Sequence, residues 1–369
     1  MTAPRLEIDL GKIEDNAAIL IDRLGRRGMS VTAVTKGVLG HPAIVKVLCN
    51  AGVQVFADSR IETIECMRKS MHSELKMWLI RGPQLSKIER IVRSCDASFN
   101  TEEDTLVQLS AEAKRQHRDH GVILMVEMGD FREGVSLQDL EAMARLVLTL
   151  PNLNLIGIGT NLGCFQRAVP NRTNMALLSE LAKQLETKLD VKFSVISGGN
   201  SSNLNWVTSE VSRGCVNNLR LGEAILLGRE AIYRNPVPGL HLDAFKLIGE
   251  VIESKCKPDL PSNAYAQRVW PQESCTTNSA GIYRTVLALG NQDCDPDGIS
   301  TIDSLPILGS SSDHIVLDTL GVAFSPGTEV VFDMDYASML RSMTSPLVEK
   351  VFKRSPRTSL HFPELLSVA

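Results

Sequence analysis

The alternation of short apolar runs with helical segments, over the first two thirds of the chain, constrains the fold more than any other feature. Eight runs have the length and composition of buried strands, and most precede a segment whose apolar residues recur at helical spacing. Strands that alternate with helices in this way form βαβ units around a parallel sheet, and eight units close a barrel. The predicted strands are 31–36, 54–59, 76–81, 97–100, 122–128, 155–161, 193–197 and 217–222.

A Pro-rich stretch at 235–239 ends this pattern, and the segments beyond it have strand periodicity only. We therefore expect an α/β protein in which a (β/α)8 TIM barrel is followed by a mainly β C-terminal domain. The barrel is predicted for residues 11–235, and the β domain for residues 1–10 plus 236–369. The polar, turn-rich segment 258–281 is left unassigned. Strands are predicted in the β domain at 6–10, 245–252, 284–289, 305–308, 315–317 and 329–333.

Composition excludes several classes of function. The net charge of −4 gives no reason to expect a nucleic acid as partner. No apolar stretch is long enough for a membrane span and the N-terminus lacks the apolar core of a signal peptide, so we expect no membrane partner and a cytoplasmic protein. The eight cysteines form no Cys-x-x-Cys pair and the histidines are dispersed, so no metal site or disulfide framework is predicted.

Lys36 closes the first predicted strand and precedes Gly37. The mouth of a barrel, where the carboxyl ends of the strands meet, is where barrel enzymes place their chemistry. A lysine amine becomes a Schiff-base nucleophile when desolvation or a neighbouring cation lowers its pKa. The alternative is a solvated lysine at a strand end.

A glycine-rich turn follows the seventh strand, with the sequence Ser-Gly-Gly-Asn-Ser-Ser at 197–202. Its glycines let the backbone approach an anion, and free N–H groups and hydroxyls supply donors. A plain turn with an Asn or Ser cap is the alternative. A strand-end lysine and a phosphate-binding turn after strand seven together form the outline of a pyridoxal-phosphate site.

Two arginines lie near the same end of the predicted barrel. Arg132 stands just past strand five and Arg220 within strand eight, where a cation is costly without a partner. Structural salt bridges are the alternative for both. In the β domain, Asp313 and His314 stand at the start of a strand, where a capped turn is the simpler interpretation of that pair alone.

Taken together, these positions resemble the alanine racemase family of fold-type III pyridoxal-phosphate enzymes. The resemblance rests on Ala33-Val34-Thr35-Lys36, on Glu127 to Gly134, on Asn200-Ser201, on Arg220-Leu221-Gly222 and on Ser311-Ser312-Asp313. Within the family the chain is most similar to ornithine racemases and related racemases of basic amino acids. The resemblance implies pyridoxal 5'-phosphate as cofactor. It implies a cofactor site made of Lys36, Arg132, Asn161, Ser197, Gly198, Gly199, Asn200, Ser202, Arg220, Gly222 and Tyr336.

The chain departs from the family at three positions. The phosphate-contacting tyrosine a few residues after the lysine is absent, and Tyr336 resembles a C-terminal tyrosine that replaces it in related decarboxylases. Asn161 stands where a histidine stacks on the cofactor ring. Asn291 stands where a tyrosine is the second catalytic base.

By resemblance, Lys36 holds the cofactor and acts as base on one face of the substrate Cα, and a second base acts on the other. That base would come from the β domain of a partner subunit, so we expect a head-to-tail homodimer with active sites at the interface. His314, Asp293 and Cys294 are the candidates, in that order, because an unperturbed histidine pKa of about 6.5 suits proton exchange in both directions.

The expected reaction is racemisation of a basic amino acid, ornithine or lysine. Racemases of this family place an arginine against the ring nitrogen, where decarboxylases place a glutamate, and Arg220 fills that position. Arg132 and Asp313 are the predicted substrate-binding residues, and Asp313 is expected either to orient the site or to bind the distal amine. Asp293 and Asp295 are further carboxylates in these loops. A decarboxylase of the same fold, a non-catalytic pyridoxal-phosphate-binding protein and a metal-aided aldolase are the alternatives.

Overall fold

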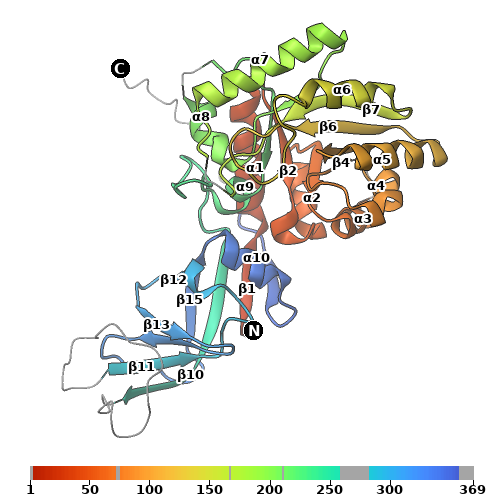
Figure 1. Ribbon diagram of the computed structural model, residues 1–369. Helices are drawn as coiled ribbons and strands as arrows, with labels where there is room; N and C mark the ends of the chain where they lie inside the picture. Colours follow the sequence, from red (N-terminus) through yellow and green to blue (C-terminus); the bar gives the residue numbers. More distant parts are fainter. Residues whose placement is uncertain (1–2, 72–74, 166–167, 210–211, 258–281, 357–369) are drawn as a thin grey trace, which may run out of the picture. The chain divides into compact units, whose positions relative to one another are not determined.

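The computed structural model describes residues 3–71, 75–165, 168–209, 212–257 and 282–356 (Figure 1). These residues divide into two compact units. The barrel unit contains residues 9–244 and 354–356. The β unit contains the described residues of 3–8 and 245–353, and the two are described separately below.

Eight parallel strands form a closed barrel, as predicted, and β2 pairs with β9 to close it. Most of their ends lie within one or two residues of the prediction. The strands are β2 (Ser30–Val34), β3 (Val55–Asp58), β4 (Lys76–Leu79), β5 (Ala97–Asn100), β6 (His120–Met125), β7 (Leu153–Gly159), β8 (Val195–Ser197) and β9 (Asn218–Leu221).

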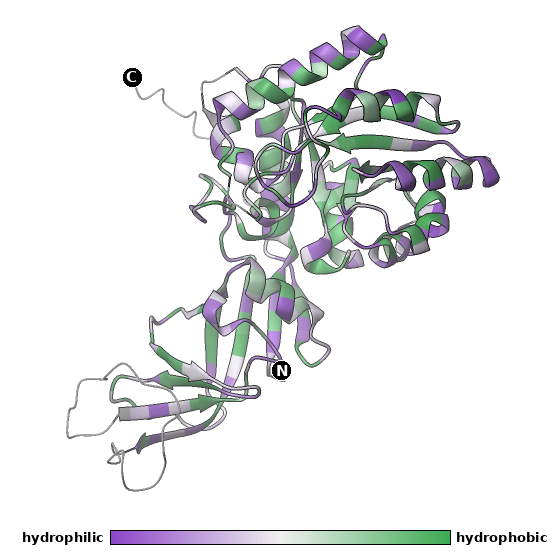
Figure 2. Ribbon diagram, in the orientation of Figure 1, coloured by the Kyte–Doolittle hydropathy of each residue, from purple (hydrophilic) through white to green (hydrophobic). Residues whose placement is uncertain are grey.

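Helices surround the barrel strands and bury one apolar face each, so the strands are mostly green and the helices mixed in Figure 2. Four short 3-10 turns, η1 (Lys36–Val38), η2 (Leu85–Lys87), η3 (Ser201–Asn203) and η4 (Pro296–Gly298), interrupt loops; the last belongs to the β unit. The barrel helices are α1 (Leu10–Gly25), α2 (Pro42–Asn50), α3 (Ile61–Ser70), α4 (Ile88–Ser94), α5 (Glu103–Arg115), α6 (Leu140–Thr149), α7 (Arg172–Leu189), α8 (Leu204–Thr208) and α9 (Glu223–Leu227).

The first barrel helix begins at a cap that also receives a distant part of the chain. The Asp9 carboxylate accepts bonds from the N–H groups of Gly11 (3.0 Å) and Lys12 (3.3 Å), which satisfies donors that a helix start leaves unpaired. It also accepts from Ser355 N at 3.1 Å and from the Ser355 hydroxyl. Residues 354–356 therefore belong to the barrel unit.

A buried apolar cluster is shared by β2, β3, β4, β5, β6 and β8. Side chains from strands on opposite sides of a barrel meet only in its interior, so the barrel is packed and is not a pore. Trp78 and Phe99 meet edge to face, with ring centroids 6.2 Å apart. The cluster consists of Val34, Ala57, Trp78, Ala97, Phe99, Ile123, Met125 and Val195.

The β unit is mainly β, as predicted, and its strand pairs are antiparallel. The strand order is β12-β15-β10-β11-β14-β13, with β1 between β10 and β16. Its one helix among the described residues is α10 (Tyr336–Thr344). The strands are β1 (Arg5–Asp9), β10 (Phe245–Lys257), β11 (Ile282–Leu287), β12 (Ile299–Thr301), β13 (Ile307–Ser310), β14 (Ile315–Asp318), β15 (Glu329–Met334) and β16 (Glu349–Lys353).

The sequence missed β12, β16 and α10, and it ended β10 too early. Residues 253–257 are polar and partly exposed, so their composition does not indicate a strand, but pairing with β11 extends β10 to Lys257. Segment 258–281 lies outside the described residues. No helix among the residues that the structure describes is both long and apolar enough to cross a bilayer.

Candidate active site

The carboxyl ends of β2, β8 and β9 hold most of the predicted site. Lys36 follows β2 as the first residue of η1, and its side chain is exposed. The barrel unit by itself therefore does not supply the desolvation expected around this amine. The preceding residue, Thr35, is buried and donates its hydroxyl to the Asp58 carboxylate at 2.8 Å, which fixes the backbone where Lys36 begins.

Arg220 lies in β9, and only 5% of it is exposed. It donates to Ser197 Oγ at 2.5 Å, to the Thr160 carbonyl at 2.8 Å and to Asn161 Oδ1 at 3.4 Å. Its guanidinium lies 4.8 Å from the centre of the Phe99 ring.

Burial lowers the pKa of Arg220 to about 10, so the side chain remains a cation at neutral pH. No carboxylate among the described residues pairs with it. A buried cation held only by neutral acceptors is costly, and this favours a functional role over the structural salt bridge that was the alternative.

The turn after β8 has the geometry of an anion site. Gly199 has φ +139°, and a Cβ there would lie 2.2 Å from Asn203 Oδ1, so the turn requires glycine. The backbone N–H groups of Gly199, Asn200 and Ser201, and that of Gly222 after β9, donate to no described group. Consecutive free N–H groups at this end of a barrel are suited to a phosphate.

The predicted hydroxyl donors of this turn are engaged within the protein. Ser202 Oγ donates to the Leu162 carbonyl at 3.2 Å, and Ser197 Oγ donates to Asn218 Oδ1 at 2.8 Å. The backbone, rather than these hydroxyls, therefore offers the free donors. Gly198 packs tightly, since a Cβ there would lie 2.8 Å from Val216.

Asn161 and Asn200 link the loops after β7 and β8. Asn200 Nδ2 donates to Asn161 Oδ1 at 3.1 Å and to the Leu162 carbonyl at 2.9 Å, while its Oδ1 accepts from Ser202 N at 2.7 Å. Asn161 Nδ2 is buried and has no partner among the described residues. This donor is left over for a ligand.

Arg132 lies in the loop after β6 and pairs with its neighbour Glu133 through both Nε and Nη2. The two side chains are 40% and 32% exposed, so the guanidinium is held in place yet can still be reached by a ligand. Burial lowers the pKa of Arg132, but the ion pair with Glu133 raises it by more. The pKa of Arg132 therefore lies above its ordinary value.

In the β unit the loops that contain Asp293 and His314 meet. A Cβ on Gly290 would lie 2.4 Å from the Ser312 carbonyl, so glycine lets the two loops touch. A pocket of about 290 Å³ lies between them. It is lined by Pro4, Ala288, Gln292, Asp293, Asp313, His314 and Leu347.

Within this pocket His314 and Asp313 are exposed, and Asp293 is 8% exposed. One Asp293 oxygen accepts from Gly290 N at 2.9 Å, and Asp313 Oδ1 accepts from Gln292 Nε2 at 2.5 Å. His314 is the most accessible of the predicted bases.

Cys294 does not suit the predicted role of base. The thiol has no exposed surface, and burial, with Asp293 nearby, raises its pKa to about 12. It is therefore neutral near pH 7 and contacts the Gly290 carbonyl at 3.7 Å. Tyr336, the predicted phosphate ligand, is half-buried and begins α10 in the β unit.

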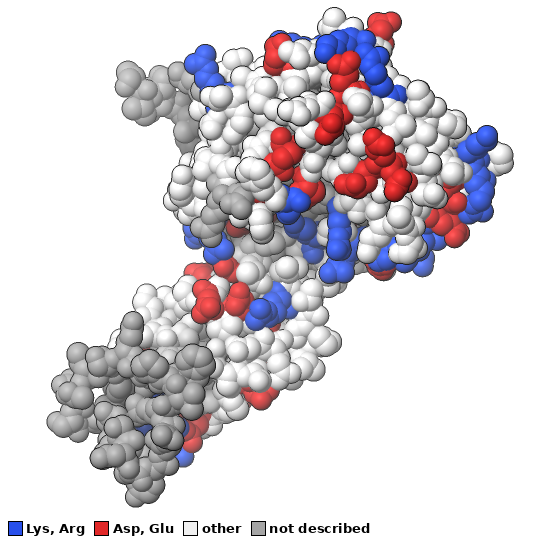
Figure 3. Space-filling model, in the orientation of Figure 1, with Lys and Arg blue, Asp and Glu red and all other residues white. Residues whose placement is uncertain are grey.

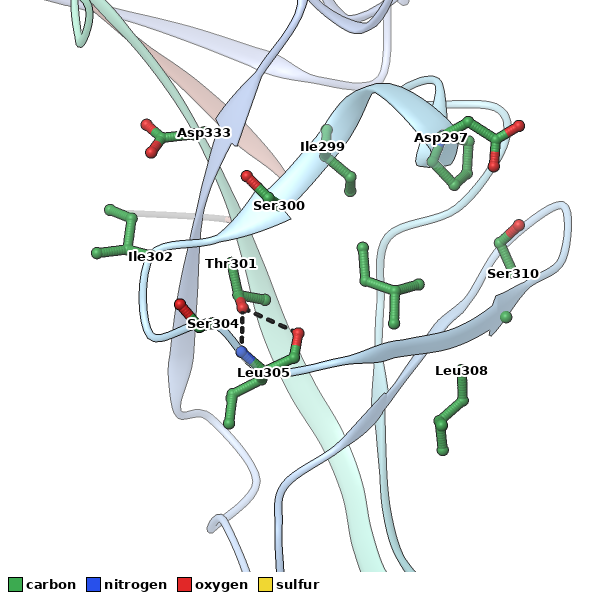
Figure 4. Close-up of a pocket in the computed structure, with 13 residues that line it drawn as sticks. Asp297, Ile299, Ser300, Thr301, Ile302, Ser304, Leu305, Leu308, Ser310 and Asp333 are labelled. Carbon is green, nitrogen blue, oxygen red and sulfur yellow. Dashed lines mark hydrogen bonds between the residues drawn. The ribbon is translucent and has the colours of Figure 1, made fainter. Parts of the chain in front are cut away.

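A second pocket of the β unit, of about 700 Å³, contains none of the predicted site residues (Figure 4). It lies beside β12 and β13. Within it, Thr301 Oγ1 accepts a hydrogen bond from Leu305 N and donates one to the Leu305 carbonyl.

Acidic and basic side chains are interspersed on the barrel face shown in Figure 3, so no strongly basic surface is seen there. The described residues contain no group of three or more metal-ligating side chains.

Sequence reasoning did not single out two buried residues beside the predicted ones: Phe99, whose ring faces Arg220, and Asp130, which accepts from the N–H groups of Cys164 and Phe165. Phe99 is a buried apolar residue of a predicted strand, and no pattern in the sequence pairs it with Arg220. Asp130 stands inside the quoted Glu127–Gly134 segment, and a carboxylate between a glycine and an aromatic residue at a strand end was the available signal.

Comparison with known proteins identifies the class. Residues 8–230 match the family described as alanine racemase, N-terminal domain. The chain belongs to this family of pyridoxal-phosphate-dependent amino-acid racemases.

Two relatives match nearly the whole chain. An ornithine racemase of Acetoanaerobium sticklandii is 34% identical over 352 residues, which are 94% of this chain and 99% of the relative. A lysine racemase of Thermotoga maritima is 33% identical over 358 residues, which are 96% of this chain and 100% of the relative.

Solved structures share the fold at lower identity. An alanine racemase from a D-cycloserine-producing Streptomyces lavendulae has a TM-score of 0.73 at 16% identity, covering 96% of this chain and 99% of its own. A D-threonine aldolase from Filomicrobium marinum has a TM-score of 0.75 at 13% identity, and the match covers 96% of this chain and 91% of the aldolase chain. An alanine racemase from Bartonella henselae, with covalently bound pyridoxal phosphate, has a TM-score of 0.72 at 16% identity. The match covers 95% of this chain and 99% of that racemase chain.

Proposed function

We propose that this protein racemises a basic amino acid, ornithine or lysine, with pyridoxal phosphate held at the carboxyl end of its barrel. The reaction class follows from the family. The substrate class is supported by two relatives, named for ornithine and lysine, that match over nearly the whole chain.

The observation that carries the proposal is Arg220, a buried cation without a carboxylate partner, beside a turn with free backbone N–H groups. These features fit the cofactor. The amides of 199–201 would hold its phosphate, Arg220 would face its ring nitrogen, Asn161 Nδ2 would meet one of its acceptors and Lys36 would bind it covalently.

When bound, pyridoxal phosphate serves as an electron sink that acidifies the substrate Cα–H bond. Lys36 Nζ would then take or return the proton on one face of Cα. Arg220 can only donate a hydrogen bond, so it would keep the ring nitrogen free of a proton and restrain side reactions. Arg132, fixed by Glu133, would bind the substrate carboxylate.

The opposite face of Cα needs a second proton carrier. We assign this role first to His314 and then to Asp293, in the β unit of a second copy within a head-to-tail homodimer. His314 is exposed, and a histidine exchanges protons readily near neutral pH.

Two measurements test the proposal. Borohydride reduction of the yellow protein followed by peptide mass mapping should place the cofactor adduct on the peptide that contains Lys36. An adduct elsewhere, or a colourless protein that takes up no cofactor, contradicts the site.

Loss of optical rotation, measured for each L-amino acid in turn, tests the substrate. Ornithine or lysine should be converted fastest. Faster conversion of alanine contradicts the substrate class, and release of carbon dioxide from these substrates would indicate a decarboxylase instead.

A further inference from the structure

We propose that Asp130, in the loop after β6, binds the distal ammonium group of the substrate. The inference rests on the proposed function and deepens it, because it names the residue that selects a basic side chain. It also moves this role from Asp313 in the β unit to the barrel unit, where the other predicted substrate ligand, Arg132, lies.

The loop that carries Asp130 is rigidly built. Glu127 Oε1 accepts from Gly129 N at 2.5 Å and from Phe131 N at 3.1 Å. A Cβ on Gly134 would lie 2.5 Å from Glu127 N, so the two ends of the loop are in close contact. Phe131 has φ +52°, an uncommon conformation for a bulky residue. The Asp130 carboxylate is thus held in one place.

Only one of the two Asp130 oxygens has a partner. Asp130 is 3% exposed, and Oδ1 accepts from the N–H groups of Cys164 (3.1 Å) and Phe165 (3.0 Å) in the loop after β7. Oδ2 is buried and accepts from no group of the described chain. A buried carboxylate oxygen without a hydrogen-bond partner favours a cation beside it.

The nearest arginine along the chain does not fill that place. Arg132, two residues on, directs Nε and Nη2 to Glu133 instead. Arg132 is near enough to interact with the Asp130 charge, but no described donor bonds to Oδ2, which leaves that oxygen for a cation that comes with the substrate.

Asp130 also belongs to the network that reaches the predicted cofactor. Cys164, which donates its N–H to Asp130, places Sγ 3.5 Å from Asn200 Nδ2. Asn200 in turn contacts Asn161, and Asn161 contacts Arg220. This chain of contacts links Asp130 to the predicted cofactor site through Cys164, Asn200 and Asn161.

The residues that follow Asp130 and Cys164 offer apolar surface. Phe131 is 72% exposed and Phe165 is 64% exposed. Such side chains at a barrel mouth are suited to the methylene groups between the two amines of ornithine or lysine. Asp313, by contrast, already accepts from Gln292 Nε2 at 2.5 Å.

The test is Asp130→Asn in the cofactor-loaded full chain. Asn keeps the oxygen that accepts from Cys164 N and Phe165 N, and it removes the charge. We expect kcat/KM for ornithine to fall about 10- to 100-fold, while kcat/KM for norleucine, the neutral isostere of ornithine, stays constant or rises. Calorimetric titration should show that the Kd for ornithine rises by a similar factor. Asp104→Asn, an exposed carboxylate of α5, is the matched control and should change neither.

A second variant keeps the inference testable if Asp130→Asn folds poorly, as its melting temperature will show. Asp130→Glu retains the charge on a side chain one methylene longer, so the ratio of ornithine to lysine turnover should shift several-fold towards ornithine. An unchanged ratio in that variant contradicts the inference.

The possible failures are distinguishable. If the wild-type protein prefers ornithine and Asp130→Asn retains the full preference over norleucine, the inference is wrong while the proposed function stands. If Asp313→Asn removes the preference instead, the β unit carries the role. A wild-type protein that prefers neutral amino acids overturns both proposals.

Discussion

Arg220 is the buried cation at the centre of the proposed site. It is buried, retains its charge, and is held by a hydroxyl, a carbonyl, an amide oxygen and an aromatic face rather than by a carboxylate. Its strand position was enough to predict a buried cation that needs polar partners, because a cation within a barrel strand is costly to bury. Its partners were not predictable, since they come from β5, β8 and the end of β7.

Replacing Arg220 tests its assigned contact with the ring nitrogen. Arg220→Glu should protonate that nitrogen, lower racemisation about 100-fold or more, and raise side reactions such as transamination. Chiral chromatography of the substrate and absorbance of the aminated cofactor measure the two effects. Unaltered racemisation would show that Arg220 does not make this contact.

His120 gives the fold a dependence on pH. It is fully buried at the start of β6, where Nε2 lies 2.8 Å from Ser98 Oγ, and burial lowers its pKa from 6.5 to about 4. The unfolded chain therefore binds this proton before the folded protein does. The contribution of neutral His120 to the free energy of unfolding is present above pH 6.5 and is lost as the pH falls towards 4. It amounts to about 3 kcal/mol at most.

Thermal unfolding between pH 7 and pH 4.5 checks this contribution. The wild-type melting temperature should fall with acid more steeply than that of His120→Gln, which has no proton to bind. His117→Asn is the control, because His117 is exposed and asparagine tolerates its positive φ. Parallel profiles for wild type and His120→Gln would show that His120 does not titrate in this range.

At the level of elements, the barrel was predictable because every unit repeats the same pattern of strand, loop and helix. The strands of the β unit were harder to predict from the sequence. β12 has three residues, and β16 has only two apolar residues in the sequence Glu-Lys-Val-Phe-Lys, so their pairing partners rather than their composition define them. The tight turn after β8 was predictable from its two glycines. The engagement of Ser197 and Ser202 was not, because it depends on loops far apart in sequence.

The turn after β8 can be tested through its glycine. Gly199→Ala places a methyl group 2.2 Å from Asn203 Oδ1 at φ +139°, so the turn must shift. Strain of about 1–3 kcal/mol corresponds to cofactor binding roughly 5- to 150-fold weaker.

Equilibrium dialysis against pyridoxal phosphate measures this loss, with unfolding midpoints to show that the barrel persists. Gly82→Ala is the control, since a Cβ there meets nothing within 4 Å. Equal affinity in both variants would place the phosphate elsewhere.

At the scale of the whole molecule, the proposed homodimer predicts complementation. Lys36→Ala and His314→Asn should each be nearly inactive, because each removes one of the two proton carriers. If every site combines Lys36 of one copy with His314 of another, mixed dimers contain one intact site, and random exchange restores roughly a quarter of wild-type activity. Activity that stays at the level of the separate variants would place both residues in one chain or His314 outside the site.

The chain passes between the two units three times, after Ile8, after Ala244 and after Lys353. The last passage brings Ser355 back to Asp9, inside the barrel unit. A protease that cuts once near residue 244 therefore cannot release either unit, because two covalent connections remain. The nicked protein should migrate as two fragments in denaturing gels and as one species in native gels. Removing the β unit by truncation at residue 244 would also take away Ser355, and with it a partner of the carboxylate that caps the first barrel helix.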